Sequence, residues 1–257
     1  MRKTMVAAAI AQLVACGGQT TTSPTAAIET LELRVQTEHF RVFAGATPDA
    51  SVRAAADRLE AEYPRILRAL NLPAVPLVSV RIWHDQATYF NELTRYFGVR
   101  YQAAGYITGP TELRVLDMPG LAVNVVHEFV HAASMSVNAG IANNPRWLWE
   151  TIALYENGEF VDPRRLDYIV RGTFPTLQQL NVDPNAGRQI YELGFVLGEF
   201  IVSRWGRPGF LRLIQTNADI PGVLGVSTAE FESAWQSYVR ERYLSSVQSA
   251  TSVDYLS

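Results

Sequence analysis

The residues best suited to chemistry lie in the stretch His127-Glu128-Phe129-Val130-His131. The surrounding residues, about 119–139, have the apolar pattern of a helix. Two histidines four positions apart lie on one face of a helix, one turn from each other, so both imidazoles can reach one metal ion. Glu128 stands beside the first histidine, close enough to hold a water molecule and accept its proton. This pattern predicts a metal site with a general base beside it.

A catalytic zinc site needs a third protein ligand and one open coordination position. A third His or Asp six residues after His131 is absent, since Val137 stands there, and Ser134 stands where such sites have glycine. The remaining arrangement takes a glutamate from a following helix. Glu150 fits that arrangement, because 18 residues separate it from His131.

The helix that carries Glu150 has clear end signals in Asn144-Pro145 and Asn157-Gly158. Glu156 is a rival ligand, but it lies about 240° around the helix from Glu150 at ~100° per residue. If Glu150 points at the metal, Glu156 points away from it. Glu159 is a second rival and lies beyond the helix end. We therefore expect His127, His131 and Glu150 to hold the metal.

These motifs resemble the gluzincin metallopeptidases, the superfamily of thermolysin-like and aminopeptidase-like zinc enzymes. Residues 147–155 read Trp-Leu-Trp-Glu-Thr-Ile-Ala-Leu-Tyr and are similar to a helix of the superfamily that reads Trp-Leu-x-Glu-Gly-x-Ala-x-Tyr. Residues 191–195, with Arg204-Trp205-Gly206 after them, resemble a later helix of that superfamily. The resemblance covers residues 120–215 well and residues 35–118 only in the order of elements. It implies a zincin-like fold, a Zn²⁺ cofactor and a peptide or protein substrate.

Two residues depart from the pattern of the superfamily. Thr151 replaces its usual glycine, and Leu154 replaces the aspartate that some members place one turn after the glutamate. No residue in the sequence is therefore identified as a partner that orients the metal ligands. The departures bear on activity more than on metal binding.

The resemblance also implies catalytic roles. Glu128 would act as the general base, and Tyr191 would donate a hydrogen bond to the developing oxyanion, as a Tyr or His from a later helix often does in gluzincins. The alternative for Tyr191 is an ordinary aromatic core residue. His84 and His39 are weaker candidates for the donor. The alternative for His84, which follows a strand, is an ordinary surface residue, and the alternative for His39 is a structural residue within a strand.

The N-terminus has the features of a secretion signal. A short basic segment precedes about ten apolar residues, which are too few to span a bilayer. Leu13-Val14-Ala15-Cys16 resembles the lipobox of bacterial lipoproteins, which implies cleavage of residues 1–15 and acylation of Cys16. Gly17 is not the aspartate that retains such proteins at the inner membrane. The alternative is an ordinary signal peptide, but Cys16 is the only cysteine.

Composition narrows the class of the protein. The chain has 257 residues, 48% of them hydrophobic, and a net charge of −3. These values indicate a globular protein and give no basic surface for nucleic acid. A single cysteine excludes both an internal disulfide and a cysteine-based zinc site. Composition therefore predicts no nucleic-acid partner, while the resemblance to the lipobox implies a lipid-anchored protein of the bacterial cell envelope.

The hydrophobic periodicity predicts an α+β fold in two parts. After a flexible tether at residues 16–29, an α/β subdomain with a small sheet covers residues 30–118 and a helical catalytic subdomain covers residues 119–245; residues 246–257 form a tail. Strands are expected at 32–43, 78–82, 101–107 and 112–116, and helices at about 49–70, 86–97, 119–139, 145–157, 187–204, 207–217 and 227–245. The strand at 112–116 is either a free sheet edge that lines the cleft or a buried hairpin strand.

Three functions fit these motifs. The first is a zinc-dependent peptide-bond hydrolase anchored to the envelope by lipid. The second is a non-catalytic metal- or ligand-binding envelope lipoprotein, although a purely structural metal site needs neither Glu128 nor an open position. The third is a zinc hydrolase that acts on amides other than peptides, since the same activation of water serves both.

Overall fold

The computed structural model describes residues 29–100, 102–182 and 187–245. These residues form an α+β protein that divides into two compact units after Ala142. Cys16, the predicted signal peptide and the predicted tail lie outside the described residues, as does nearly all of the predicted tether. Among the helices of the described part, none has the length and apolar character needed to cross a membrane.

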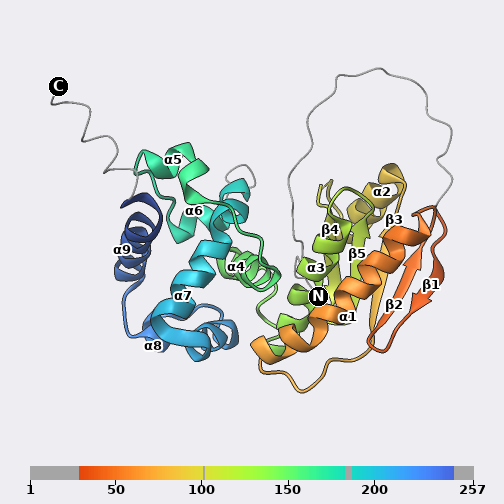
Figure 1. Cartoon of the computed structure of the whole chain (residues 1–257), viewed down its shortest axis with the longest axis horizontal. Helices are drawn as coiled ribbons and strands as arrows, with labels where there is room; N and C mark the ends of the chain where they lie inside the picture. Colours follow the sequence, from red (N-terminus) through yellow and green to blue (C-terminus); the bar gives the residue numbers. More distant parts are fainter. Residues whose placement is uncertain (1–28, 101, 183–186, 246–257) are drawn as a thin grey trace. The chain divides into compact units, whose positions relative to one another are not determined.

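The first unit contains the sheet, with three helices packed on it (Figure 1). Its elements are β1 (Glu32–Gln36), β2 (Phe40–Ala44), α1 (Asp49–Ala69), β3 (Val78–Trp83), α2 (Gln86–Phe97), β4 (Gly105–Gly109), β5 (Glu112–Leu116) and α3 (Leu121–Val137). The strand order is β1-β2-β3-β5-β4. The three central strands β2, β3 and β5 are parallel, and each edge strand is antiparallel to its neighbour.

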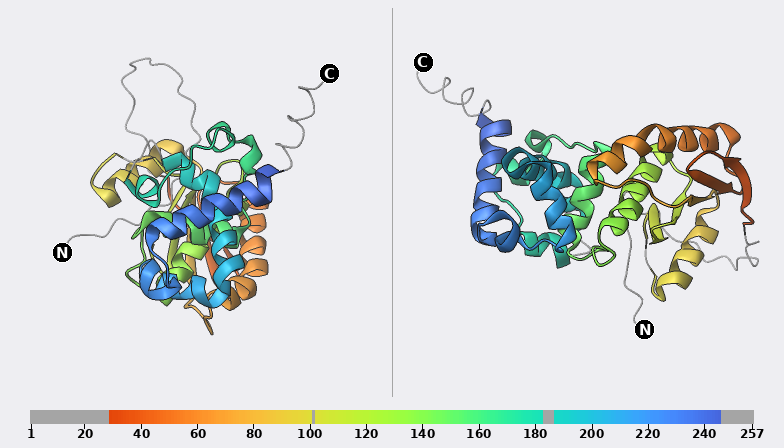
Figure 2. Two further views of the ribbon diagram at one scale, coloured as in Figure 1. Left: turned by 90° about the vertical axis from the view of Figure 1, so that its left-hand side faces the viewer. Right: turned by 90° about the horizontal axis from the view of Figure 1, so that it is seen from below.

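One face of this sheet is the core of the unit. Alternating strand residues such as Val42, Val80 and Leu113 are fully buried and lie side by side in the register of the sheet. Helices α1 and α3 contact each other and the sheet, and Figure 2 shows them in orange and green from two further directions. Phe129 of α3 packs against Phe40 of β2, with their ring centroids 5.1 Å apart. The core therefore fixes α3 against the sheet.

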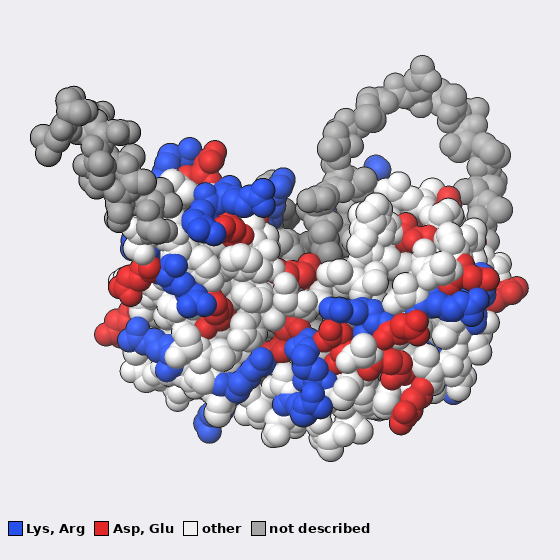
Figure 3. All heavy atoms as spheres, viewed as in Figure 1, with Lys and Arg blue, Asp and Glu red and all other residues white. Residues whose placement is uncertain are grey.

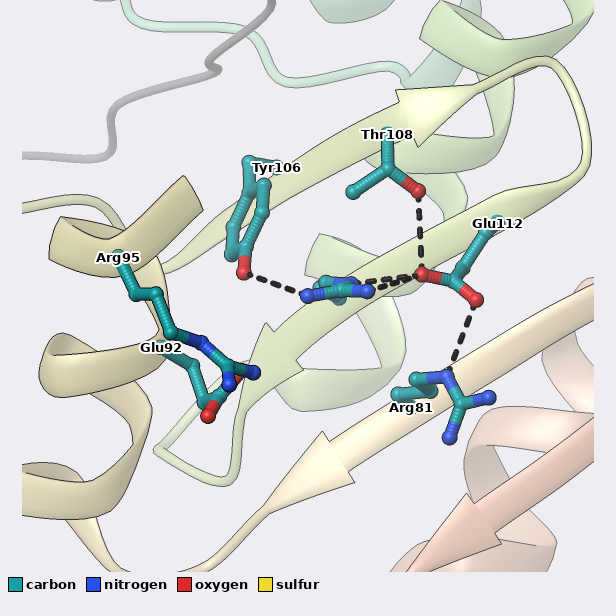
Figure 4. A network of polar contacts seen from close by, with 7 residues as sticks. Arg81, Glu92, Arg95, Tyr106, Thr108 and Glu112 are labelled. Atoms are coloured by element: carbon teal, nitrogen blue, oxygen red, sulfur yellow. Dashed lines mark hydrogen bonds and ion pairs between the residues drawn. The ribbon is translucent and has the colours of Figure 1, made fainter. Parts of the chain in front are cut away.

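The opposite sheet face carries a polar network (Figure 4). The Glu112 carboxylate accepts hydrogen bonds from Arg114 at 2.6 Å, from Arg81 at 3.0 Å and from Thr108 at 3.1 Å. Arg114 also donates to the Tyr106 hydroxyl at 3.3 Å. Burial by itself would raise the pKa of Glu112, but the hydrogen bonds from the two guanidinium groups outweigh it and hold that pKa below 4.5.

One sequence-based expectation about the strands is wrong. The single strand expected at 32–43 is a hairpin of β1 and β2, because the chain reverses at Thr37, whose N–H donates to the Phe40 carbonyl at 2.9 Å. Of the two alternatives for residues 112–116, the structure has the hairpin strand, because β5 pairs with both β3 and β4 and the edge strand is β4. The antiparallel pairing of β4 with β5 confirms the predicted hairpin.

The second unit is helical. It contains α4 (Arg146–Asn157), the short 3₁₀ helix η1 (Pro163–Arg165), α5 (Asp167–Val170), α6 (Leu177–Val182), α7 (Gly187–Gln215), α8 (Ile220–Leu224), α9 (Thr228–Val239) and a π-helical turn η2 (Arg240–Leu244). Helix α7 is interrupted at Gly206, whose φ is 68°, which accounts for the two helices predicted there. Ser227 and Glu230 form a capping box at the start of α9.

Helices α4 and α7 pack closely because α7 has glycines at the contact. A Cβ on Gly194 would lie 2.5 Å from Leu154 of α4, and a Cβ on Gly198 would lie 2.6 Å from Tyr155. Real Cβ atoms do not approach other heavy atoms this closely, so a larger residue at Gly194 would require Leu154 to move and one at Gly198 would require Tyr155 to move. The two glycines therefore permit the close contact between α4 and α7.

The division between the units differs from the one predicted at residue 118. Helix α3 packs against α1, β4 and β5, and it therefore belongs with the sheet rather than with the later helices.

Acidic and basic residues are interspersed over the face of the protein that Figure 3 shows, which agrees with the net charge of −3.

Candidate metal centre

Helix α3 positions two of the predicted ligands. It begins after Gly120, whose positive φ of 92° suits glycine, and it is packed among apolar residues for most of its length. His127, Glu128 and His131 have no exposed surface at all. Burying a carboxylate and two imidazoles costs free energy, and proteins tolerate that cost where partners offset it. Three such groups within five residues of one buried helix indicate a functional site.

The two imidazoles lie together, as the spacing predicts. Their ring centroids are 4.8 Å apart, and the ring planes make an angle of 82°. Residues four apart in a helix are neighbours on its surface, so this arrangement follows from the helix itself. Two nitrogen ligands for one ion are therefore available from a single turn of α3.

Helix α4 positions the predicted carboxylate ligand. The helix begins after Pro145 and ends at Gly158, which has the left-handed φ of 76° typical of a helix end. Glu150 lies in its middle and is fully buried. The Tyr191 hydroxyl of α7 donates a hydrogen bond of 3.0 Å to Glu150 Oε1. Arg146, one turn earlier on α4, places its Nε 4.0 Å from the same oxygen.

His127, His131 and Glu150 are close enough to hold one metal ion. Each offers one ligand atom, and the three atoms lie within 4.8 Å of one another. Two imidazole nitrogens and a carboxylate oxygen are a donor set that zinc uses in catalytic sites, and imidazole also suits copper, iron and nickel. The donors fit a divalent transition metal, and they leave room in a four-coordinate shell for one further ligand.

The rival carboxylates have other partners. Glu156 is 3% exposed and pairs with Arg207 of α7. Glu159 accepts a hydrogen bond of 2.8 Å from the Asn157 side chain. Neither belongs to the metal-ligand group of the described residues, whereas Glu150 does. The helical geometry that placed Glu156 on another side of α4 accounts for this outcome.

The sequence did not identify the residues that orient Glu150. Arg146 is only 13% exposed, and its guanidinium carbon lies 5.8 Å from the centre of the Tyr191 ring. Both side chains lie beside the Glu150 carboxylate, and Leu154 packs against Gly194. The spacing of Arg146 and Glu150, four residues apart on one helix, was the available signal for Arg146.

The two remaining histidines lie in other surroundings. His39 stacks on Tyr63, with 3.7 Å between ring centroids, and bonds to Glu60 at 2.7 Å, which agrees with a structural role. The side chain of His84 is 53% exposed, and its Nδ1 lies 2.8 Å from Asp117. That hydrogen bond raises the pKa of His84 above 6.5. Neither histidine belongs to the metal-ligand group of the described residues.

The geometry is therefore that of a buried group of two imidazoles and one carboxylate that could hold a metal ion, with Glu128 adjacent to His127 in sequence. Tyr191 donates a hydrogen bond to the Glu150 carboxylate, and Arg146 forms an ion pair with it at 4.0 Å. No model of a known protein family matches the chain, and no curated protein matches it either.

Proposed function

We propose that this protein is a zinc-dependent peptide-bond hydrolase of the gluzincin type, held at the bacterial cell envelope by a lipid on Cys16. The observation that carries the proposal is that ligand atoms of His127, His131 and Glu150 lie within 4.8 Å of one another. The spacing of these residues and the resemblance of residues 147–155 to the glutamate helix of gluzincins support zinc and peptide hydrolysis in particular.

Zinc, when bound by His127, His131 and Glu150, supplies a Lewis acid that lowers the pKa of water toward ~7 and polarises a carbonyl group. The chain supplies the proton transfers. Glu128 accepts a proton from the attacking water as the water oxygen bonds to the scissile carbonyl carbon. As the C–N bond breaks, Glu128 gives that proton to the leaving amine, so the base is regenerated.

Tyr191 contributes to this scheme in two ways. Its hydroxyl donates to Glu150 at 3.0 Å, which orients the carboxylate for metal binding. The resemblance to gluzincins assigns the same residue to the developing oxyanion, where a positioned donor is worth a large factor in rate. We propose the first role for the resting protein and the second for the reaction.

The experiment combines metal analysis with a screen of peptide libraries on the full-length protein. We expect about one zinc per chain. Glu128→Gln keeps the size of the side chain but removes the base, so it should keep the zinc and lose hydrolysis. If the Glu128→Gln variant cleaves the same peptides as fast as wild type, Glu128 is not the base.

The alternative is a non-catalytic metal-binding lipoprotein, which the departures at Thr151 and Leu154 favour. The same experiment separates the two functions. One zinc per chain without any cleavage that depends on Glu128 would establish the alternative and overturn the hydrolase.

A further inference from the structure

The start of strand β4 lies against the side chain of Glu128. A Cβ built on Gly105 would be 2.4 Å from Glu128 Oε1 and 2.8 Å from both Cγ and Cδ. Real Cβ atoms essentially never come this close to another heavy atom, so any other residue at Gly105 would have to displace Glu128. Glu128 is fully buried and has no solvent to move into.

Backbone geometry does not explain this glycine. Gly105 is not among the residues with positive φ, and it pairs with Val115 as the first residue of β4. Glycine weakens a strand, and where it occurs inside one it often marks the close approach of another group. Here the group that approaches is the carboxylate proposed as the general base.

Two hydrogen bonds hold the adjacent backbone in place. Asn124 lies one turn before Glu128 on α3, is 3% exposed, and donates from Nδ2 to the Ala104 carbonyl at 3.1 Å. The same carbonyl accepts the Leu116 N–H at 2.8 Å. The segment that faces Glu128 is thereby tied to α3 on one side and to β5 on the other.

From these contacts we infer that Gly105 is a positioning residue: the missing side chain forms a slot that seats the Glu128 carboxylate, and Asn124 fixes the wall of that slot. The role in catalysis rests on the proposed function, whereas the slot itself does not. A general base acts only from the correct position, and a displacement of about 1 Å can cost about 10²-fold in rate.

The first test measures the slot without activity, in a double-mutant cycle on the full-length, metal-free protein. Gly105→Ala should lower the Tm by several degrees in wild type, because it forces Glu128 out of its buried position. The same substitution should have little effect in a Glu128→Ala background, where the space is vacated. An equal loss of Tm in both backgrounds would overturn the inference. Should Gly105→Ala fail to fold, recovery of folding by Glu128→Ala supports the slot, and failure to recover overturns it.

Gly109→Ala is the matched control. Gly109 is at the other end of the same strand, its φ is not positive, and a Cβ there meets no atom within 4 Å. Its substitution should leave Tm and hydrolysis close to those of wild type. A loss equal to that of Gly105→Ala would show that β4 merely disfavours alanine and would overturn the inference.

The second test measures positioning. On a peptide that wild type cleaves, Gly105→Ala should lower kcat about 100-fold, with KM little changed and about one zinc per chain retained. Undiminished kcat would overturn the inference while leaving the proposed function intact. If wild type cleaves no peptide, the proposed function fails, and the double-mutant cycle alone decides the slot.

Discussion

At the scale of single residues, the site is built from side chains whose burial is costly. His127, His131, Glu128 and Glu150 are all fully buried, and Arg146 is nearly so. A protein core tolerates such groups when they bind one another or a metal ion. Each of these side chains can be tested by a substitution of its own.

The metal ligands can be distinguished from the other histidines. His131→Ala removes one of three protein ligands, so we expect the zinc content of the purified protein to fall from about one per chain to nearly none. His84→Ala is the control, because His84 is 53% exposed and pairs with Asp117. If zinc stays at one per chain in His131→Ala, or is lost equally in His84→Ala, the ligand assignment is wrong.

Tyr191→Phe tests the hydrogen bond to Glu150. The substitution keeps the ring and removes only the hydroxyl, so the carboxylate loses a donor that orients it. Loss of such a partner typically weakens metal binding 10–100-fold, and we expect about 10-fold for this single bond. Competition with a chelator measures the change in zinc affinity. Unchanged affinity would show that the hydroxyl does not orient the ligand.

At the scale of elements, the sheet of the first unit depends on the network around Glu112. The folded-state pKa of Glu112 lies below 4.5. The ionised carboxylate therefore stabilises the fold at pH values above 4.5, and this stabilisation is lost as the pH falls through the folded-state pKa. Glu112→Gln should therefore be less stable than wild type near neutral pH, by about 0.5 kcal/mol for partly exposed pairs. The difference should disappear in acid.

Thermal unfolding of wild type and Glu112→Gln at about pH 7 and about pH 3 measures this dependence. Glu32→Gln, on the exposed strand β1, is the control and should show no comparable difference. A difference between wild type and Glu112→Gln that persists unchanged in acid would contradict the account of the network.

Elements with strong local signals were predictable from the sequence. Helix α2 runs over Gln86–Phe97 as predicted, because Asp85 caps its start and Gly98 ends it with a left-handed φ. The division of residues 32–43 into two strands was not, because the turn at Thr37 has no glycine or proline to mark it. Local patterns indicate the ends of helices better than reversals of strands.

The candidate site was predictable for a similar reason. His127 and His131 are neighbours within one helix. Glu150 could be chosen because residues 147–155 resemble a helix of the gluzincins and because its rival Glu156 lies on another side of that helix. The contacts of Gly105 and Asn124 join residues about twenty positions apart along the chain, and no periodicity signals such a pair. The candidate ligands could be found from the sequence, whereas the contacts around Glu128 required the structure.

At the scale of the whole molecule, the prediction concerns the anchor at Cys16. If Cys16 carries lipid, Cys16→Ser should move the protein from the membrane fraction to the soluble fraction, because several acyl chains are lost at once. Gly17→Ser is the control and should leave the protein in membranes. Fractionation of expressing bacterial cells measures the distribution, and an unchanged membrane fraction for Cys16→Ser would contradict the lipoprotein assignment.

The most direct test of the account is anomalous X-ray diffraction at the zinc edge on crystals of the purified protein. The account predicts a single peak at ligand distances of about 2.0–2.2 Å from a nitrogen of His127, a nitrogen of His131 and an oxygen of Glu150. A zinc peak held by other residues, or bound histidines with Glu150 outside the coordination shell, would contradict it.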